Sequence, residues 1–235
     1  MPKVGYEVFM KSRPSAKVGW AWVEETGMPT LRAVLVWGLR ACRNALVDLR
    51  FGSPLGMSSR LSDVARKQED RRGYSYDWNS DSEALGYIFR DRIQPSDVLV
   101  DIGCGKGRVI NWWLHQGYRN RIIGIELDPV VAENTRRRLR KYDNITIIAG
   151  NILENIPPEA TCFYMFNPFG APMVEALKNR LADVFAGRRD MRLLYYNCKQ
   201  VHVFENDPNW NVERVTLPPS PHIPFSPLPV ITPPQ

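Results

Sequence analysis

The sequence predicts an α/β fold: a seven-strand, mostly parallel sheet with helices on both faces, preceded by an N-terminal helical cap. From residue 98 onward, short apolar runs alternate with stretches of helical periodicity, and this alternation is typical of a parallel sheet. Residues 1–30 are irregular, and helical periodicity begins at residue 31. The composition, with 44% hydrophobic and 24% charged residues in a chain of 235, excludes disordered, collagen-like and coiled-coil chains.

Three segments are expected: a basic helical cap over residues 1–92, an α/β domain over 93–217 and a Pro-rich tail over 218–235. Residues 31–50 have apolar side chains at helical spacing and arginines on the other side, which predicts an amphipathic helix. Residues 1–72 contain 13 Lys and Arg against 7 Asp and Glu, so a charge of +6, equal to the net charge of the whole chain, lies in this part of the cap. A basic cap suits nucleic acid, an anionic membrane or an acidic substrate, and solvated arginines on a cap over the ligand site explain it as well.

The elements of the α/β domain follow from apolar runs and helix start signals. Asp128 can cap a helix whose first position is Pro129, and Pro172 has the same first-turn role in a later helix. Strands are expected at 98–102, 122–127, 145–149, 162–166 and 193–196. Helices are expected at 81–90, 108–116, 129–141 and 172–186. Because ligands of such sheets bind at the carboxyl ends of the strands, the residues just after each strand are the first candidates for a site.

The last 19 residues, 217–235, contain eight prolines. Proline cannot donate a hydrogen bond to a neighbouring strand, so this tail is expected to be a poor central strand. We expect it to lie on its own domain or to be disordered, with a docking tail for a partner as the alternative. Residues 211–217 are the candidate for a final antiparallel strand.

Several classes of protein are excluded by what the sequence lacks. The four cysteines are far apart and no CxxC or Cys/His cluster occurs, which argues against a structural metal site and a disulfide framework. The longest uncharged apolar run, residues 33–39, is far shorter than the roughly 20 residues of a membrane span. The N-terminus has no secretory signal pattern, so the cytoplasm is the expected compartment.

The strongest motif is VLVDIGCGKGR at residues 98–108, where an apolar strand runs into a glycine-rich loop and a helix. Glycines let the backbone turn sharply and approach a ligand closely. The GxGxG spacing of Gly103, Gly105 and Gly107 differs from the GxGxxG of a dinucleotide site, and no GxxxxGK[ST] loop occurs. Asp101 places a carboxylate where a pyrophosphate would lie, and a carboxylate suits a ligand with an ammonium group.

Two further polar residues follow the next two strands. Glu126 ends the second strand, where a carboxylate can accept both ribose hydroxyls of an adenosine. Asn151 follows the third strand, where an amide can read an adenine edge. Each alone fits a strand-end turn, but the three together, each at the carboxyl end of a strand, indicate a nucleoside pocket.

Residues 74–215 resemble the class I S-adenosylmethionine-dependent methyltransferases, on the strength of DIGCGKG, GIELDP and AGNI. The resemblance implies a Rossmann-like fold and S-adenosylmethionine as the cofactor. In that family the glycine loop holds the methionine part. The acid after the second strand, here Glu126, binds ribose, and Leu127 packs on adenine. Asn151, where the family usually has Asp, and Ile152 border the adenine.

The strings GKGR and FNPFG resemble a bacterial subgroup related to the seven-strand histone-lysine methyltransferases. In that subgroup an upstream Tyr closes over the cofactor, and Tyr76 is the candidate here. FNPFG is also similar to the Asn-Pro-Pro-aromatic motif of amino-methyltransferases, in which Asn and Pro oxygens accept hydrogen bonds from the target nitrogen and the aromatic ring stacks on the substrate. This implies Asn167, Pro168 and Phe169 as catalytic residues. Phe169 replaces the second Pro, however, Gly170 takes the aromatic position, and N-P-x-G also fits a type I turn.

The predicted function is methyl transfer from S-adenosylmethionine to a nitrogen of an unidentified acceptor, a protein amine or a small molecule, with nucleic acid less favoured. The alternatives are a non-catalytic cofactor- or nucleic-acid-binding module on the same fold and an NAD-dependent dehydrogenase, against which the GxGxG spacing argues. Tyr195 and Tyr196 are candidate general bases by position, as is Tyr76. The basic run at residues 136–141 is interpreted as a solvated helix end.

Overall fold

The computed structural model describes residues 31–52, 80–218 and 225–233. The chain divides into two compact units, Met1–Cys42 and Arg43–Gln235. The predicted amphipathic helix is present as α2, Leu31–Arg50, which begins in the first unit and ends in the second. None of the helices in these described ranges is both long and apolar enough to cross a membrane.

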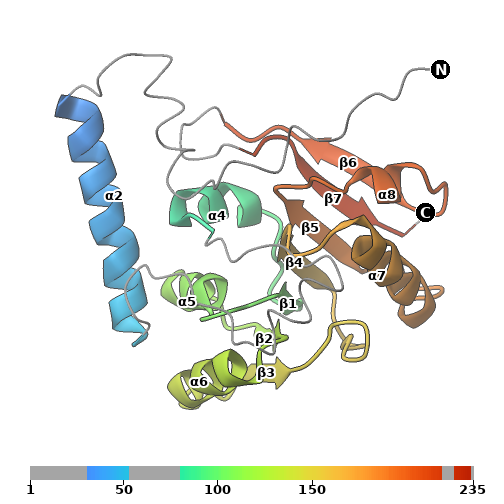
Figure 1. The fold of residues 1–235 in the computed structure, drawn as a ribbon, viewed down its shortest axis with the longest axis horizontal. Helices are drawn as coiled ribbons and strands as arrows, with labels where there is room; N and C mark the ends of the chain where they lie inside the picture. Colours follow the sequence, from blue (N-terminus) through green and yellow to red (C-terminus); the bar gives the residue numbers. More distant parts are fainter. Residues whose placement is uncertain (1–30, 53–79, 219–224, 234–235) are drawn as a thin grey trace, which may run out of the picture. The chain divides into compact units, whose positions relative to one another are not determined.

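The second unit contains one seven-stranded sheet, which confirms the predicted fold class (Figure 1). Its strand order is β3-β2-β1-β4-β5-β7-β6, with β7 antiparallel to both of its neighbours and the other pairs parallel. The strands are β1 (Val98–Ile102), β2 (Arg121–Glu126), β3 (Ile145–Ala149), β4 (Cys162–Phe166), β5 (Arg192–Tyr196), β6 (Asn211–Val215) and β7 (Leu228–Thr232). The order reverses between β1 and β4, where this class of fold binds its ligands.

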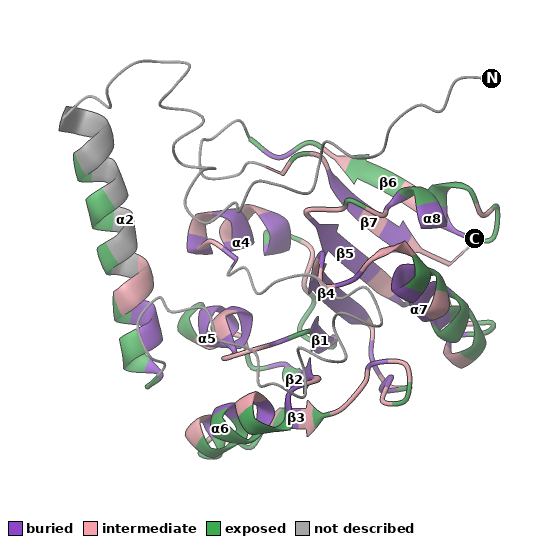
Figure 2. Ribbon diagram, viewed as in Figure 1, coloured by how far each residue is buried: buried purple, intermediate pink, exposed green. Residues whose placement is uncertain are grey.

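Helices cover both faces of the sheet and enclose two hydrophobic cores (Figure 2). Along β1, Leu99 points into one core and Val100 into the other, as the alternation of a strand requires. One face packs against α4 (Ser82–Phe89), α5 (Arg108–His115) and α6 (Pro129–Leu139). The other packs against α7 (Ala171–Val184) and α8 (His202–Glu205).

The start signals read from the sequence act as expected. The Asp128 side chain accepts hydrogen bonds from the backbone N–H of Val130 and Val131, at 2.8 and 3.2 Å, and Pro129 opens α6. Asp81 caps α4 in the same way, accepting from the Glu83 N–H at 2.8 Å. These caps satisfy N–H groups that the first helical turn leaves without partners.

The expectation that the Pro-rich tail is a poor central strand is wrong. Strand β7 lies within that tail and is inserted between β5 and β6. Its ladder to β5 consists of two residue pairs, at Val230 and Ile231, and Pro229 lies outside it. The missing N–H of Pro229 therefore interrupts no pair of that ladder, which is the condition under which a sheet accepts proline.

Candidate active site

The carboxyl ends of β1 and β2 bring the predicted cofactor residues together. The two strands are parallel and in register, with Asp101 opposite Gly124. After β1 the chain turns over β2, and the N–H groups of Gly103 and Cys104 both donate to the Ile125 carbonyl, at 2.9 and 3.0 Å. The glycine loop, residues 103–107, is thereby attached to the end of the neighbouring strand.

The three glycines of this loop are required by its backbone geometry. Gly103, Gly105 and Gly107 have φ angles of 74°, 51° and 73°, in the left-handed region that other residues rarely adopt. A Cβ on Gly103 would lie 3.5 Å from Cβ of Pro168, an ordinary van der Waals distance. The loop after β1 and the motif after β4 are therefore in contact.

Glu126 holds the glycine loop with one carboxylate oxygen and the start of α6 with the other. Oε2 accepts from the Gly105 N–H at 2.9 Å, and Oε1 accepts from the Asp128 N–H at 2.8 Å. The side chain is 8% exposed. These bonds fix the carboxylate between the glycine loop and the start of α6.

Asp101 is buried beside this carboxylate, with 3% of its surface exposed. Its Oδ2 has no hydrogen-bond partner among the residues that the structure describes. Burial, and secondarily the negative charge of Glu126, raises the pKa of Asp101 to about 8. A buried carboxyl group in this state favours a proton or a cationic ligand, since either removes the cost of an uncompensated charge.

The residues predicted to border the adenine occupy different environments. Asn151 is half-buried, and its Oδ1 accepts from the Leu153 N–H at 3.0 Å, so this oxygen stabilises the turn after β3. Leu127 is half-buried at the end of β2. Ile152 is 3% exposed and packs in the core on the α7 face.

Asn167 and Phe169, which follow β4, are both buried. Asn167 has a φ of 44° and is 5% exposed. Its Oδ1 accepts a 2.8 Å hydrogen bond from the Tyr195 hydroxyl, which in turn accepts from the Gln200 N–H at 3.3 Å. Phe169 is 5% exposed and packs in the core with α7, so its ring is directed away from solvent.

The tyrosines proposed as general bases are unsuited to that role. Burial raises the pKa of both Tyr195 and Tyr196, whereas a base must be deprotonated near neutral pH. Tyr76 lies outside the described residues.

Sequence reasoning missed two groups at this edge of the sheet. The first is an aromatic cluster of Phe166, Tyr196 and Phe225, with ring centroids 5.2 to 5.7 Å apart. The second is Arg138, which bonds to the glycine loop although the run 136–141 was interpreted as solvated. Helical spacing could have indicated this contact, because Arg138 lies three residues after Thr135, a buried residue of α6.

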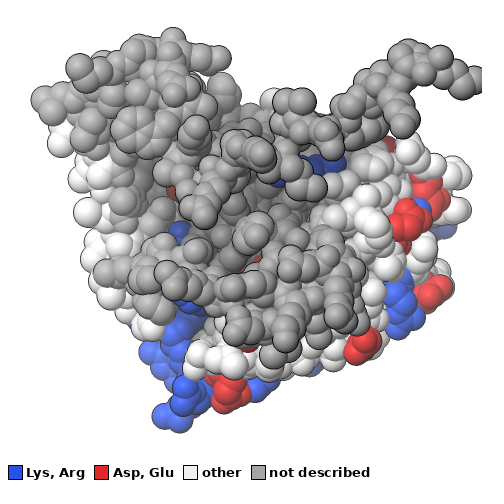
Figure 3. All heavy atoms as spheres, in the orientation of Figure 1, with Lys and Arg blue, Asp and Glu red and all other residues white. Residues whose placement is uncertain are grey.

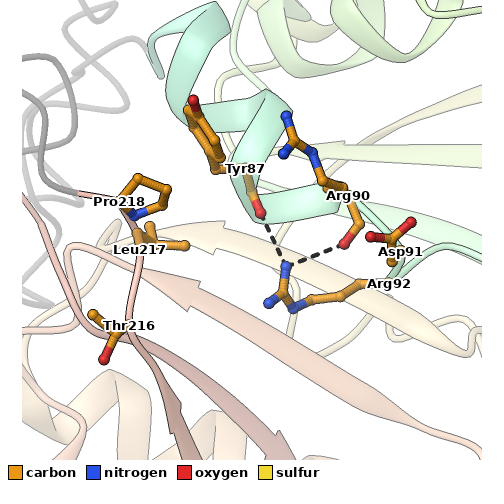
Figure 4. A pocket seen from close by; sticks show the side chains of 7 residues that line it. All are labelled: Tyr87, Arg90, Asp91, Arg92, Thr216, Leu217 and Pro218. Carbon is orange, nitrogen blue, oxygen red and sulfur yellow. Dashed lines mark hydrogen bonds between the residues drawn. The ribbon is translucent and has the colours of Figure 1, made fainter.

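A pocket of about 350 Å³ lies elsewhere, between the end of α4 and the segment after β6 (Figure 4). Arg90, Asp91 and Arg92 line it, and the Arg92 guanidinium donates to the Tyr87 carbonyl at 2.9 Å. Every site residue predicted from the sequence is absent from its lining.

Comparison with known families gives a match over the strands that form this site. Residues 99–186 match the family model described as "Methyltransferase domain". This range includes the glycine loop, Glu126 and Asn167.

Curated proteins match over similarly limited stretches. A probable cobalt-precorrin-6B C(15)-methyltransferase (decarboxylating) of Archaeoglobus fulgidus is 31% identical over 67 residues, 28% of this chain and 39% of that protein. A probable ribosomal RNA small subunit methyltransferase A of Methanosarcina barkeri is 36% identical over 78 residues, 32% of this chain and 26% of that protein. The match therefore spans well under half the length of these relatives.

Among solved structures, the B. subtilis tRNA methyltransferase TrmK is similar with a TM-score of 0.51 and 18% sequence identity. The alignment covers 64% of this chain and 65% of that one. A likeness at this level establishes a shared fold.

Proposed function

We propose that this protein is an S-adenosylmethionine-dependent methyltransferase that transfers the methyl group to a nitrogen atom. One observation carries the proposal: the carboxyl edge of the sheet joins the buried Asp101, the left-handed glycine loop and Glu126 within the segment that matches the methyltransferase model. The contact between Gly103 and Pro168 puts the motif after β4 beside them.

The residues present fit this cofactor. The unpartnered, buried Oδ2 of Asp101 suits the ammonium group of the methionine part. The Glu126 carboxylate, which holds the Gly105 N–H at the end of β2, is a charged acceptor of the kind that ribose hydroxyls would bond to. Leu127 and Asn151, both half-buried after their strands, would border the adenine.

The cofactor supplies an electrophilic methyl group on a sulfonium. The work of the protein is to place the acceptor atom in line with that methyl group and to exclude water. In this proposal Asn167 and Pro168 present oxygen acceptors to the target amine. Because Asn167 Oδ1 already accepts from Tyr195, its second lone pair is the one available for a substrate N–H.

Protein amines and small molecules are the first candidates for the methyl acceptor, and RNA is the second. It is favoured by the matches to ribosomal RNA methyltransferases. Lys and Arg side chains also gather over α6 in the view of Figure 3. A basic surface attracts phosphates without selecting a sequence.

Isothermal titration of the full chain with S-adenosylmethionine, S-adenosylhomocysteine and NAD tests the cofactor. We expect micromolar binding of the first two and none of NAD. Binding of NAD without S-adenosylhomocysteine would overturn the proposal in favour of a dehydrogenase.

The acceptor is tested by incubation with labelled S-adenosylmethionine and three pools: amine-bearing peptides, small amines and RNA. We expect label on nitrogen. In an active pool, Asn167→Ala should lower turnover and leave cofactor affinity unchanged, because the contact acts on the acceptor. Label found on oxygen or carbon alone would contradict the nitrogen assignment.

A further inference from the structure

The glycine loop needs side chains from elsewhere to fix its shape. Three of its five residues are glycines with positive φ, and glycine has more conformational freedom to lose than any other residue. Glu126 holds the Gly105 N–H, and the Gly107 N–H donates within the loop to the Cys104 carbonyl at 2.7 Å. The Gly105 and Lys106 carbonyls, which belong to the next two peptides, require partners of their own if the loop is to keep one conformation.

Two side chains of α6, one helical turn apart, supply those partners. Thr135 Oγ1 donates to the Gly105 carbonyl at 2.9 Å, and Arg138 Nη2 donates to the Lys106 carbonyl at 2.5 Å. Thr135 is 2% exposed. Because a peptide group is planar, fixing these carbonyls also fixes the direction of the N–H groups in the same planes.

Arg138 connects the loop to two further segments. Its Nη1 donates at 2.8 Å to Asn111 Oδ1 in α5 and at 2.8 Å to the carbonyl of Phe51, just beyond α2. The packing is close: a Cβ on Gly107 would lie 3.0 Å from Nη2. The planar guanidinium thus binds three separate segments at once, which lysine with its single ammonium group cannot reproduce.

The C-terminal end of the glycine loop is held by the end of α2, close in sequence to Phe51. Arg108 follows Gly107 directly, and its Nη2 forms a 2.6 Å ion pair with Asp48 Oδ2 in the last turn of α2. The Asp48 side chain is 4% exposed. Residues 48–51 therefore contact both Arg108, which follows the glycine loop, and Arg138, which bonds to it.

We propose that Arg138 is a positioning residue for cofactor binding, and that with Arg108 it ties the glycine loop to residues 48–51. Removing it takes away the donor to the Lys106 carbonyl and lowers cofactor affinity without removing any group that touches the cofactor. This inference rests on the proposed function, since it assigns a role in holding the loop to which the cofactor is proposed to bind.

The test compares Arg138→Met with Arg137→Met, its neighbour in α6. Arg137 is exposed and bonds to Asn134 in its own helix, so it controls for loss of one charge from the same surface. S-adenosylhomocysteine is titrated into each variant at a temperature well below its Tm. We expect about ten-fold weaker binding for Arg138→Met, a smaller loss for Arg138→Lys and no change for Arg137→Met.

Amide hydrogen exchange of the ligand-free protein provides a readout that does not depend on the cofactor. In Arg138→Met the amides of residues 103–107 should exchange faster, while those of β1 and β4 keep their rates. Thr135→Val, which removes one bond to the Gly105 carbonyl, should show the same pattern to a lesser degree, and it serves if Arg138→Met fails to fold.

The outcomes separate the two proposals. If the unchanged protein binds no S-adenosylhomocysteine but residues 103–107 exchange faster in Arg138→Met, the cofactor assignment fails, while the role of Arg138 in holding the glycine loop is supported. If the unchanged protein binds and Arg138→Met binds equally well while only its Tm falls, Arg138 is structural and the positioning proposal is overturned.

Discussion

Asp97 and Asp101 lie at opposite ends of β1 and have opposite environments. Asp97 accepts hydrogen bonds from the Gln94 N–H at 2.6 Å, from Thr161 Oγ1 at 2.7 Å and from the Arg192 guanidinium. Burial alone would raise the pKa of Asp97, but these bonds, with that of Arg192 foremost, lower it. Burial raises the pKa of Asp101 to about 8, and its Oδ2 has no partner among the described residues.

This difference distinguishes the two edges of the sheet. At the amino edge, where the parallel strands begin, the polar groups stabilise the fold. The carboxyl edge, where these strands end, is the one that we propose binds a ligand. At the amino edge even Asn120 is bonded, donating to the carbonyls of Gln94 and Asp97 at 2.8 and 2.9 Å. At the carboxyl edge two buried polar atoms, Oδ2 of Asp101 and the hydroxyl of Tyr196, have no hydrogen-bond partner within the described ranges. An unsatisfied buried polar group costs stability, and we propose that a ligand satisfies Oδ2 of Asp101.

The largest expected effect is on stability at the amino edge. Arg192→Met removes the partner of a buried carboxylate and should lower the free energy of unfolding by about 3 kcal/mol. The affinity of the folded protein for S-adenosylhomocysteine should not change. Denaturant unfolding and titration measure the two quantities. Arg214→Met, which breaks an exposed pair with Glu205, is the control and should cost under about 1 kcal/mol.

At the carboxyl edge, Glu126→Ala should weaken S-adenosylhomocysteine binding by about 1.5–3 kcal/mol, because it removes a charged acceptor and the bond to the Gly105 N–H. Glu126→Gln keeps an acceptor oxygen and should lose less. If both variants bind as tightly as the unchanged protein, the site is not at this strand end.

The pH dependence of stability should have opposite signs for the two aspartates. Asp101 has a raised pKa when folded, so between pH 4 and about 8 the folded state binds more protons and ligand-free stability falls as pH rises. The slope is at most about 1.4 kcal/mol per pH unit. The contribution of Asp97, whose pKa is lowered, is present above pH 4 and is lost on acidification.

Asp101→Asn should therefore abolish the falling slope and weaken cofactor binding, and the exposed Asp183→Asn should do neither. Unfolding at pH 5, 6, 7 and 8 measures the slope. An unchanged slope in Asp101→Asn would show that the carboxyl group is ionised in the folded, ligand-free protein.

The smallest effect concerns Asn167, which lies at the carboxyl edge but is bonded. Tyr195→Phe should cost about 1 kcal/mol of stability through the lost bond to Asn167 Oδ1. In a double-mutant cycle with Asn167→Ala, the two losses should not add, with a coupling of about 0.5–1 kcal/mol. Additive losses would mean that the bond does not position Asn167.

Much of the fold was predictable because its signals are local. Asp128 and Pro129 mark the start of α6 within two residues, and β1, β3, β4 and β5 each contain an apolar run with a glycine or asparagine directly after the strand. The position of β7 was not predictable from its own prolines, because β5 and β6, which supply its hydrogen bonds, are distant in the sequence.

The sequence by itself determined the succession of strands and helices along the chain, the glycine loop and the pair of carboxylates at the ends of β1 and β2. These depend on backbone conformation and side-chain type at single positions, which a few neighbouring residues set. Only the tertiary structure decided that Asp101 is unpaired while Asp97 is paired, that Asn167 bonds to Tyr195, and that Arg138 holds the loop. Each of these depends on which residues from other elements lie within about 3 Å, and that distance is fixed by packing.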